Sequence, residues 1–272
     1  LRENAAALNI NPSTKDNEGA TGFHYACLNG WSHVVNIFMG NAVALSIDLN
    51  IQNNNGTTPF HWVWMEDNST RLVKIFMENA ATLRIDLNIK NNYVTTAFHW
   101  ACLTGKSYLV KIFMDYAATH GIDLNSQNNN GMTGFHQTCL SKNSKLIKLF
   151  MDHEYSNSID HNRKDNHGNT GFHYICRSGK SALVKMFMEN VAALSIDLHM
   201  KNNCGMSGLE IASRKGFTDV VKIFCLEEKG FALNSVIKGS FRCGQDFYEE
   251  RICFGKWTGF HKACLSRCCL NH

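Results

Sequence analysis

Short apolar stretches alternate with polar, asparagine-rich stretches along most of the chain. At 34–39 every residue except Asn36 is apolar, and at 183–188 every residue except Lys185 is apolar. Side chains spaced in this way fall on one broad face of a helix and leave a polar position outside it. The pattern predicts a series of short amphipathic helices.

The pattern has a fixed period. A Phe-His pair recurs at intervals of 37, 38, 37 and 37 residues, and Leu209-Glu210 takes the sixth place after a further 37. The five pairs are Phe23-His24, Phe60-His61, Phe98-His99, Phe135-His136 and Phe172-His173. Self-similarity at such a period is the signature of a repeat architecture.

Each unit has start and stop signals for two helices. A hydroxyl residue two positions before each pair is suited to cap a first short helix, because its oxygen accepts a free backbone N–H. These residues are Thr21, Thr58, Thr96, Thr133, Thr170 and Ser207. Pro59 falls at the first helical position, where its missing N–H costs nothing. Helix-ending glycines follow at Gly30, Gly105, Gly179 and Gly216.

A pair of short helices cannot bury its apolar face alone, so neighbouring units must stack. With Thr58-Pro59-Phe60-His61 as the nearest copy of a Thr-Pro-Leu-His signature, and Gly216 followed by Val220-Val221, the chain resembles an ankyrin repeat protein. The resemblance implies a mainly α fold: a solenoid of stacked helix-turn-helix units with short β-turn fingers.

The resemblance divides the chain into three parts. Residues 1–11 resemble the end of a truncated preceding repeat, and residues 12–234 hold six ankyrin-like repeats of 37–38 residues. Residues 235–272 hold a divergent insertion and a partial seventh repeat, which begins at Thr258 and is suited to cap the array.

Three departures from the family pattern carry expectations. The unit exceeds the family's roughly 33 residues, so we expect a second helix longer by one turn. Glycine replaces the signature proline at Gly22, Gly134, Gly171 and Gly208, at about 1 kcal/mol relative to alanine inside a helix. Lys142-Asn143 replaces a helix-ending glycine and Val94 a finger glycine, so we expect looser joints there.

Histidine and cysteine recur together, which raises the question of catalysis or metal binding. Cys27, Cys102, Cys139 and Cys176 each follow a repeat histidine by three positions. A catalytic dyad is needed once, and the resemblance implies that this histidine braces the finger and that the cysteine is buried. The C-terminal Cys243, Cys253, Cys264, Cys268 and Cys269 lack paired metal-ligand spacing. We expect no metal and no cofactor.

Two columns of equivalent residues allow alternative interpretations. One column, on the outer side of the second helices, consists of Lys74, Lys111, Lys148, Lys185 and Lys222. A solvated outer face is favoured there over a binding site for an acidic partner. Tyr25, Trp62, Trp100, Gln137, Tyr174 and Ile211 share one position in the first helices. Packing between repeats is favoured there, and partial exposure would favour binding.

Composition and charge exclude several classes of function. The 272 residues are 44% hydrophobic and 18% charged, with a net charge of +4. This balance is too small for nucleic acid to be the default partner, and no apolar run is long enough for membrane insertion. With no phosphate loop, nucleophile elbow or zinc-protease motif, we expect no enzyme and no small-molecule substrate. The unpaired pattern of the repeat cysteines favours an intracellular, cytoplasmic protein.

The expected function is a protein-interaction scaffold for a partner protein or peptide. The sites that such a repeat leaves free are its finger tips and the concave first-helix surface just after the cysteine position. The tip candidates are Asn17, Glu18, Asn54, Asn55, Asn92, Tyr93, Asn129, Asn130, Asn166, His167 and Asn203. The first-helix candidates are Asn29, Glu66, Thr104, Ser141, Ser178 and Lys215.

Two alternatives remain open. The chain can also be the regulatory or substrate-docking segment of a larger enzyme, channel or adaptor. A minor hypothesis, implied by the family resemblance, is hydroxylation of the repeated Asn50, Asn88, Asn125 and Asn162. The sequence does not identify the partner, because ankyrin arrays carry many specificities on one scaffold.

Overall fold

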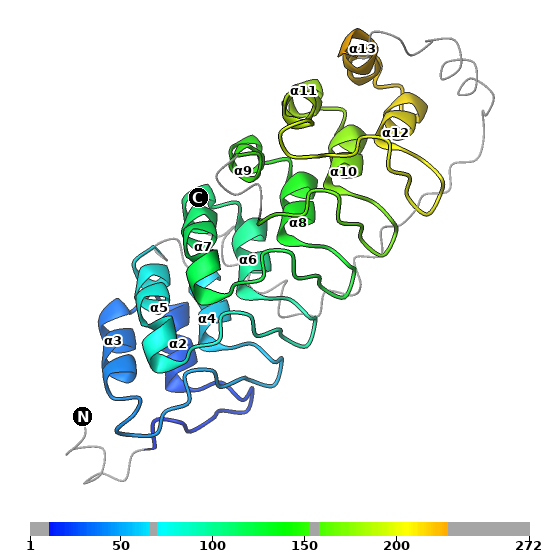
Figure 1. Ribbon diagram of the computed structural model, residues 1–272. Coiled ribbons are helices and arrows are strands. Elements are labelled where there is room, and N and C mark those ends of the chain that lie inside the picture. The colour runs from blue at the N-terminus through cyan, green and yellow to red at the C-terminus, as the bar shows by residue number, and fades with distance from the viewer. Residues whose placement is uncertain (1–10, 66–69, 153–157, 228–272) are drawn as a thin grey trace, which may run out of the picture. The chain divides into compact units, whose positions relative to one another are not determined.

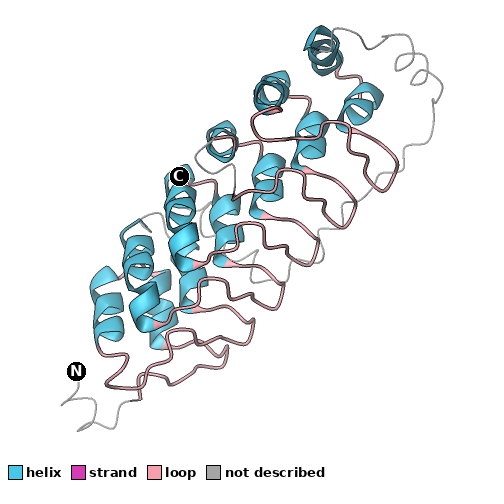
Figure 2. Ribbon diagram, in the orientation of Figure 1, coloured by secondary structure: helices cyan, strands magenta, loops and turns pink. Residues whose placement is uncertain are grey.

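The computed structural model describes residues 11–65, 70–152 and 158–227, all of which belong to one unit, Leu1–Phe231. Within these residues all regular structure is helical and there is no strand (Figure 2). Residues 1–10 of the expected preceding repeat (1–11), the insertion, the partial seventh repeat and the C-terminal cysteines lie outside the described residues.

The helices come in pairs, and the first helix of each pair is short. The first helices are α2 (Gly22–Leu28), α4 (Pro59–Trp62), α6 (Ala97–Thr104), α8 (Gly134–Ser141), α10 (Gly171–Ser178) and α12 (Gly208–Arg214), with a 3-10 turn η1 (Val63–Met65) after α4. The second helices are α3 (Ser32–Gly40), α5 (Thr70–Leu83), α7 (Ser107–His120), α9 (Ser144–Phe150), α11 (Ser181–Asn190) and α13 (Thr218–Glu227).

The two kinds of helix form two layers. Each first helix packs on the first helix of the next unit. Among the second helices, α3, α5, α7 and α9 pack in chain order and α11 packs on α13, while the loops extend from the first-helix layer as fingers (Figure 1). The mainly α, stacked helix-turn-helix class predicted from the sequence is confirmed.

A seam of phenylalanine rings lies between the layers. Phe60 in α4 packs on Phe76 of its own unit, with centroids 4.7 Å apart, and on Phe113 of the next unit at 5.7 Å. Phe135 likewise contacts Phe150 at 5.3 Å and Phe187 at 6.0 Å. Each such ring therefore stabilises two units at once.

The first helices begin at the predicted hydroxyl caps. The Thr133 backbone N–H donates to Nδ1 of His136 at 3.1 Å, and the Thr133 hydroxyl lies 2.9 Å from the same nitrogen. The same box forms at Thr21, Thr58, Thr96 and Thr170, and Glu210 closes it for Ser207. This reciprocal capping satisfies backbone groups that a helix terminus otherwise leaves unpaired.

The expectation of a longer second helix is correct for two units and wrong for two others. Helices α5 and α7 each have 14 residues, but α3 has 9 and α11 has 10, and both continue as turns. Gly40, where the third unit has Asp115, lowers the helix propensity at the end of α3. Helix α9 ends at Phe150, shortly before the undescribed residues 153–157.

The glycines that replace the signature proline stand at the first position of their helices rather than inside them. A Cβ on Gly171 would lie 2.6 Å from a ring carbon of Phe135 and 3.0 Å from Sγ of Cys139. Gly134 and Gly208 meet the equivalent Phe and Cys of the preceding unit, whereas at Gly22 the nearest atom, in Phe38, is 3.6 Å away. Three of the four glycines thus permit close packing between units.

Candidate binding surface

The first polar residue of each finger tip builds the turn itself. The Asn128 side-chain oxygen accepts the backbone N–H of Asn130 at 2.9 Å and of Met132 at 3.0 Å. The equivalent residues Asp16, Asn53, Asn91, Asp165 and Asn202 accept the same two bonds in their own fingers. Such a side chain folds the backbone locally and offers this oxygen to no partner.

The second asparagine of the tip joins one finger to the previous one. Asn54 donates its side-chain amide to the carbonyl of Asn17 at 3.0 Å, and its backbone N–H to the carbonyl of Glu18 at 3.0 Å. Asn92, Asn166 and Asn203 donate to the carbonyls of Asn54, Asn129 and Asn166 at 2.8–3.0 Å. The amide nitrogens therefore already serve the stack.

A tip glycine makes this joint possible. Gly131 has φ +70°, and a Cβ on it would lie 2.4 Å from Oδ1 and 2.6 Å from the backbone nitrogen of Asn166. In the third finger Val94 takes this place with φ +57°. There the backbone bond from Asn129 to the Tyr93 carbonyl lengthens to 3.4 Å, and among the described residues the Asn129 side chain makes no equivalent bond. This is the loosened contact that the sequence predicts.

The fourth unit keeps its helix-ending geometry without glycine. Lys142 adopts φ +60° at the end of α8, and Asn143 caps α9 by accepting the Leu146 N–H at 3.2 Å. Asn143 also donates to the carbonyl of Gly105 in the preceding unit at 3.0 Å. The expected looseness is therefore not visible in these contacts, although a left-handed lysine costs more than a glycine.

The repeat histidines brace the fingers, as the family resemblance implies. Nε2 of His136 lies 3.1 Å from the carbonyl of Asn169 in the next finger. A carbonyl can only accept, so Nε2 carries the proton and Nδ1 accepts from the cap. Burial, the largest cause, lowers the pKa of His61 and of His99 to about 4. These histidines are therefore neutral structural groups at neutral pH.

The repeat cysteines are part of the core. Cys27, Cys102, Cys139 and Cys176 have no exposed surface, and burial raises the pKa of each thiol. Buried thiols of this kind are unreactive. Within the part of the chain that the structure describes, no group of three or more His, Cys, Asp or Glu side chains is placed to hold a metal ion.

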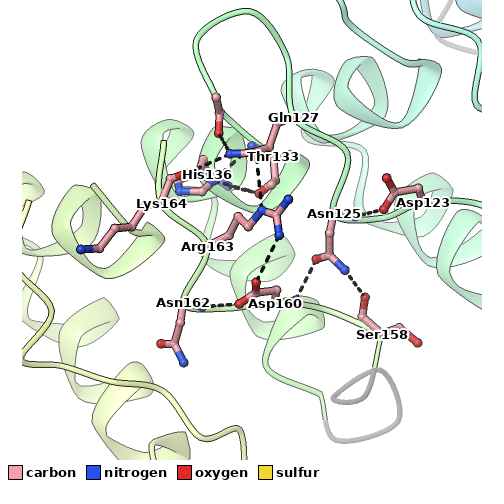
Figure 3. Close-up of polar contacts among 11 residues, drawn as sticks. Asp123, Asn125, Gln127, Thr133, His136, Ser158, Asp160, Asn162, Arg163 and Lys164 are labelled. Carbon is pink, nitrogen blue, oxygen red and sulfur yellow. Dashed lines mark hydrogen bonds and ion pairs between the residues drawn. The ribbon is translucent and has the colours of Figure 1, made fainter. Parts of the chain in front are cut away.

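The asparagine after each second helix makes a second set of joints. Asn125 donates its amide to the carbonyl of Ser158 at 2.9 Å and accepts the Asp160 N–H at 2.8 Å (Figure 3). Asn50, Asn88 and Asn162 bond the next unit in the same way. The amides named for hydroxylation are thus engaged at both ends.

The tip candidates mostly lie at the surface. Asn17, Glu18, Asn54, Asn92, Tyr93, Asn129, Asn130, Asn166, His167 and Asn203 are exposed, and Asn55 is half-buried. Their exposed parts are limited by the bonds between fingers, so the residues that add chemistry beyond the joint are Glu18, Tyr93 and His167. The sequence interpretation did not foresee that the amides hold the stack.

The first-helix candidates are polar but partly committed. Asn29, Thr104, Ser141 and Lys215 are exposed, Ser178 is half-buried, and Glu66 lies outside the described residues. The hydroxyls of Thr104, Ser141 and Ser178 donate to carbonyls of their own helices at 2.9, 2.9 and 2.6 Å. These groups are therefore weaker anchors than the sequence alone indicates.

The preceding position in each first helix was missed. Leu103 and Leu140 occupy this position in α6 and α8, and 44% and 38% of their surfaces are exposed. Arg177 and Arg214 take it in α10 and α12. The signal in the sequence was a leucine directly after the buried cysteine, on the solvent side of a helix whose core face was already assigned.

The lysine column lies wholly at the surface, whereas the aromatic column is buried in part. Every lysine of the outer column is exposed, and Lys111, Lys185 and Lys222 form ion pairs within their helices at 2.9–3.9 Å. In the aromatic column Trp62 is buried and donates to the Thr57 hydroxyl at 2.9 Å, whereas Tyr25 is 38% exposed and Trp100 and Tyr174 are half-buried. That column is core at Trp62 and surface at Tyr25.

The family model for ankyrin repeats, in three copies, matches residues 23–128, 63–165 and 136–237. The chain belongs to the ankyrin repeat family. Members of this family generally mediate contacts between proteins as non-catalytic scaffolds, and they are commonly intracellular. None of the helices in the described ranges is long and apolar enough to cross a membrane.

Solved structures show the same fold. The ankyrin repeat domain of Bcl-3, a member of the IkappaB protein family, is 20% identical with a TM-score of 0.66, covering 78% of this chain and 88% of that domain. The ankyrin repeat protein EF0377 is 19% identical with a TM-score of 0.62, covering 78% of this chain and 98% of that one. The comparison with curated proteins finds no match.

Proposed function

We propose that this chain binds a partner protein or peptide through its finger tips and the finger-facing surface of its first helices, without catalysis. The observation that carries the proposal is that the side chains which hold the stack together differ from the large side chains which lie exposed. Asparagine and histidine side chains join the repeats and aspartate side chains fold the fingers, while Tyr93, Leu103 and Leu140 are large and 43%, 44% and 38% exposed. Large apolar side chains that lie exposed at the surface, such as those of Leu103 and Leu140, are typical of interaction sites.

Affinity capture with the full chain tests this proposal. The test variant carries Tyr93→Ser, Leu103→Ser and Leu140→Ser together, and the matched control carries Lys74→Gln, Lys148→Gln and Lys185→Gln on the second helices. Quantitative mass spectrometry compares the captured proteins, and circular dichroism compares the unfolding midpoints. We expect the test variant to lose partners that the wild type and the control retain, at similar midpoints. Equal capture by all three proteins would contradict the proposal.

A further inference from the structure

One row of equivalent side chains changes its chemistry along the stack. The row consists of Leu103 on α6, Leu140 on α8, Arg177 on α10 and Arg214 on α12, one residue from each of four consecutive units. We call these four residues the inner row. Its first two members are exposed leucines, and its last two are arginines of which Arg214 is exposed and Arg177 half-buried.

The inner row faces the fingers. Each member follows the aromatic-column residue of its helix by three positions, and such residues share one helix face. The Tyr174 hydroxyl donates to the Asp165 carboxylate, which builds the turn of its finger. Arg177, three positions after Tyr174, therefore lies on the finger side of α10.

The arginine end of the row carries an excess of positive charge. Lys215 follows Arg214 and is exposed, and Lys201 lies 3.8 Å from the Glu210 carboxylate. The acidic groups on this side are already committed. Asp165 accepts the Tyr174 hydroxyl, and Glu210 accepts the Ser207 N–H at 2.6 Å beside Lys201 and Arg214. Lys201 and Arg214 therefore lie beside Glu210, and the two carboxylates named here are already engaged in the fold.

The stacking of the units sets the distance between neighbouring members of the inner row. Neighbouring first helices pack directly on each other, and packed helices lie about 8–10 Å apart. An extended peptide advances about 3.3 Å per residue, so that one unit corresponds to about three residues of a bound extended strand.

We propose that the segment which docks on the inner row is an extended peptide with two apolar side chains followed, at intervals of about three residues, by two acidic side chains. The apolar side chains lie against Leu103 and Leu140, and the acidic side chains pair with Arg177 and Arg214. Charge complementarity favours this peptide over a wholly apolar peptide. Arginines covered by an apolar peptide would lose their hydration and gain no ionic partner. This inference rests on the proposed function and specifies its ligand.

The test uses a displayed library of random twelve-residue peptides selected on the full chain, followed by fluorescence anisotropy with individual labelled peptides. One designed probe has leucine, leucine, glutamate and glutamate at three-residue intervals in a serine background, made in both chain directions. A second probe has the same residues at two-residue intervals. Protein variants are Arg177→Gln with Arg214→Gln, and, as a matched control, Lys148→Gln with Lys185→Gln.

We expect selected peptides to carry the apolar and acidic residues at the three-residue spacing, and to bind about tenfold more weakly to the arginine variant than to the lysine control. Replacing both glutamates of the designed probe by glutamine should weaken binding equally. Selected peptides that depend on Leu103 and Leu140 but show no acidic preference would overturn this inference and leave the proposed function standing. Selected peptides whose binding responds to no change in the inner row or the tips would overturn both.

Discussion

The joint between the third and fourth units and the joint between the fourth and fifth share their histidine contacts, and they differ in the contact between the finger tips. In both, a histidine reaches the next finger, from His99 to Met132 at 3.0 Å and from His136 to Asn169 at 3.1 Å. The finger contact is 3.4 Å at Asn129 but 3.0 Å at Asn166. A close contact between two fingers therefore needs more than the asparagine. The residue at the tip-glycine position of the preceding finger must also lack a Cβ.

Acid should weaken the joints that the buried histidines brace, among them the joint from the third to the fourth unit through His99 and the preceding joint through His61. Because burial holds the folded pKa of His61 and His99 at about 4, the unfolded chain takes up their protons first, below its own value of about 6.5. Stability is therefore full above pH 6.5 and is lost as pH falls towards 4.

From pH 7 to pH 5 the loss should be about 2 kcal/mol for each of these two histidines. Urea unfolding at pH 7, 6 and 5 measures it. Glu210, whose pKa is lowered chiefly by the backbone N–H of Ser207, should keep its capping bond in this range. An unfolding free energy that stays constant between pH 7 and pH 5 would contradict the assignment of neutral, buried histidines.

Placing a valine at the tip glycine of the fourth finger, as Val94 stands in the third, should have the next largest effect on stability. In Gly131→Val, the added side chain meets Asn166 in a left-handed backbone conformation that a β-branched residue rarely adopts. We expect a loss of about 3 kcal/mol from strain and from two broken bonds between fingers. Urea unfolding gives the total, and hydrogen exchange should locate the lost protection at the fourth and fifth fingers. A loss confined to other units would show that the fingers are not coupled at this point.

A matched pair of alanine substitutions separates the finger contact from the helix contact. Gly171→Ala forces a methyl group against Phe135 in the same joint, where overpacking costs about 2 kcal/mol. Gly22→Ala meets only ordinary contact distances and should raise stability by up to about 0.5 kcal/mol. The difference between the two unfolding midpoints measures the value of the missing Cβ. Equal midpoints would mean that the rings move aside freely.

Repairing the poorer joint should give the smallest change. Val94→Gly removes a side chain from a residue at φ +57° and clears space for Asn129. We expect a gain of about 1 kcal/mol and new protection of the Asn129 backbone amide in hydrogen exchange. A Val94→Ala variant is the control, since it keeps a Cβ in the same backbone conformation. If alanine and glycine stabilise equally, bulk rather than the Cβ explains the long contact.

The sequence was sufficient for the repeat and for the residues at which the first helices begin, because the signals are local. Thr133 followed by His136 is a capping pair over one turn, and the spacing of the apolar positions fixes the buried face. The sequence was insufficient for the tip amides, since an amide such as that of Asn54 has the same chemistry whether it meets a partner or the neighbouring finger. That choice depends on the distance between units, which no local pattern records.

The inner row shows the opposite error of a prediction from sequence: its leucines look like core residues but lie at the surface. Leu103 and Leu140 have the composition of a core, and only the stacked helices show that the core is complete without them. Their exposure follows from helix phase, since one position separates them from the fully buried Cys102 and Cys139. A helix of eight residues, such as α6 or α8, tolerates no error of one position in that phase.

The phenylalanine seam has a consequence for cooperativity. Because a ring such as Phe135 contacts second-helix rings in two units, unfolding one unit removes packing from its neighbour as well, and the coupling energy between units becomes large relative to the stability of each. Domains with this ratio melt in few steps rather than one unit at a time. Among the residues that the structure describes, the sixth unit has Leu209 in place of the ring and meets the seam through Phe224. We therefore expect this unit to unfold more readily than the units that carry the ring.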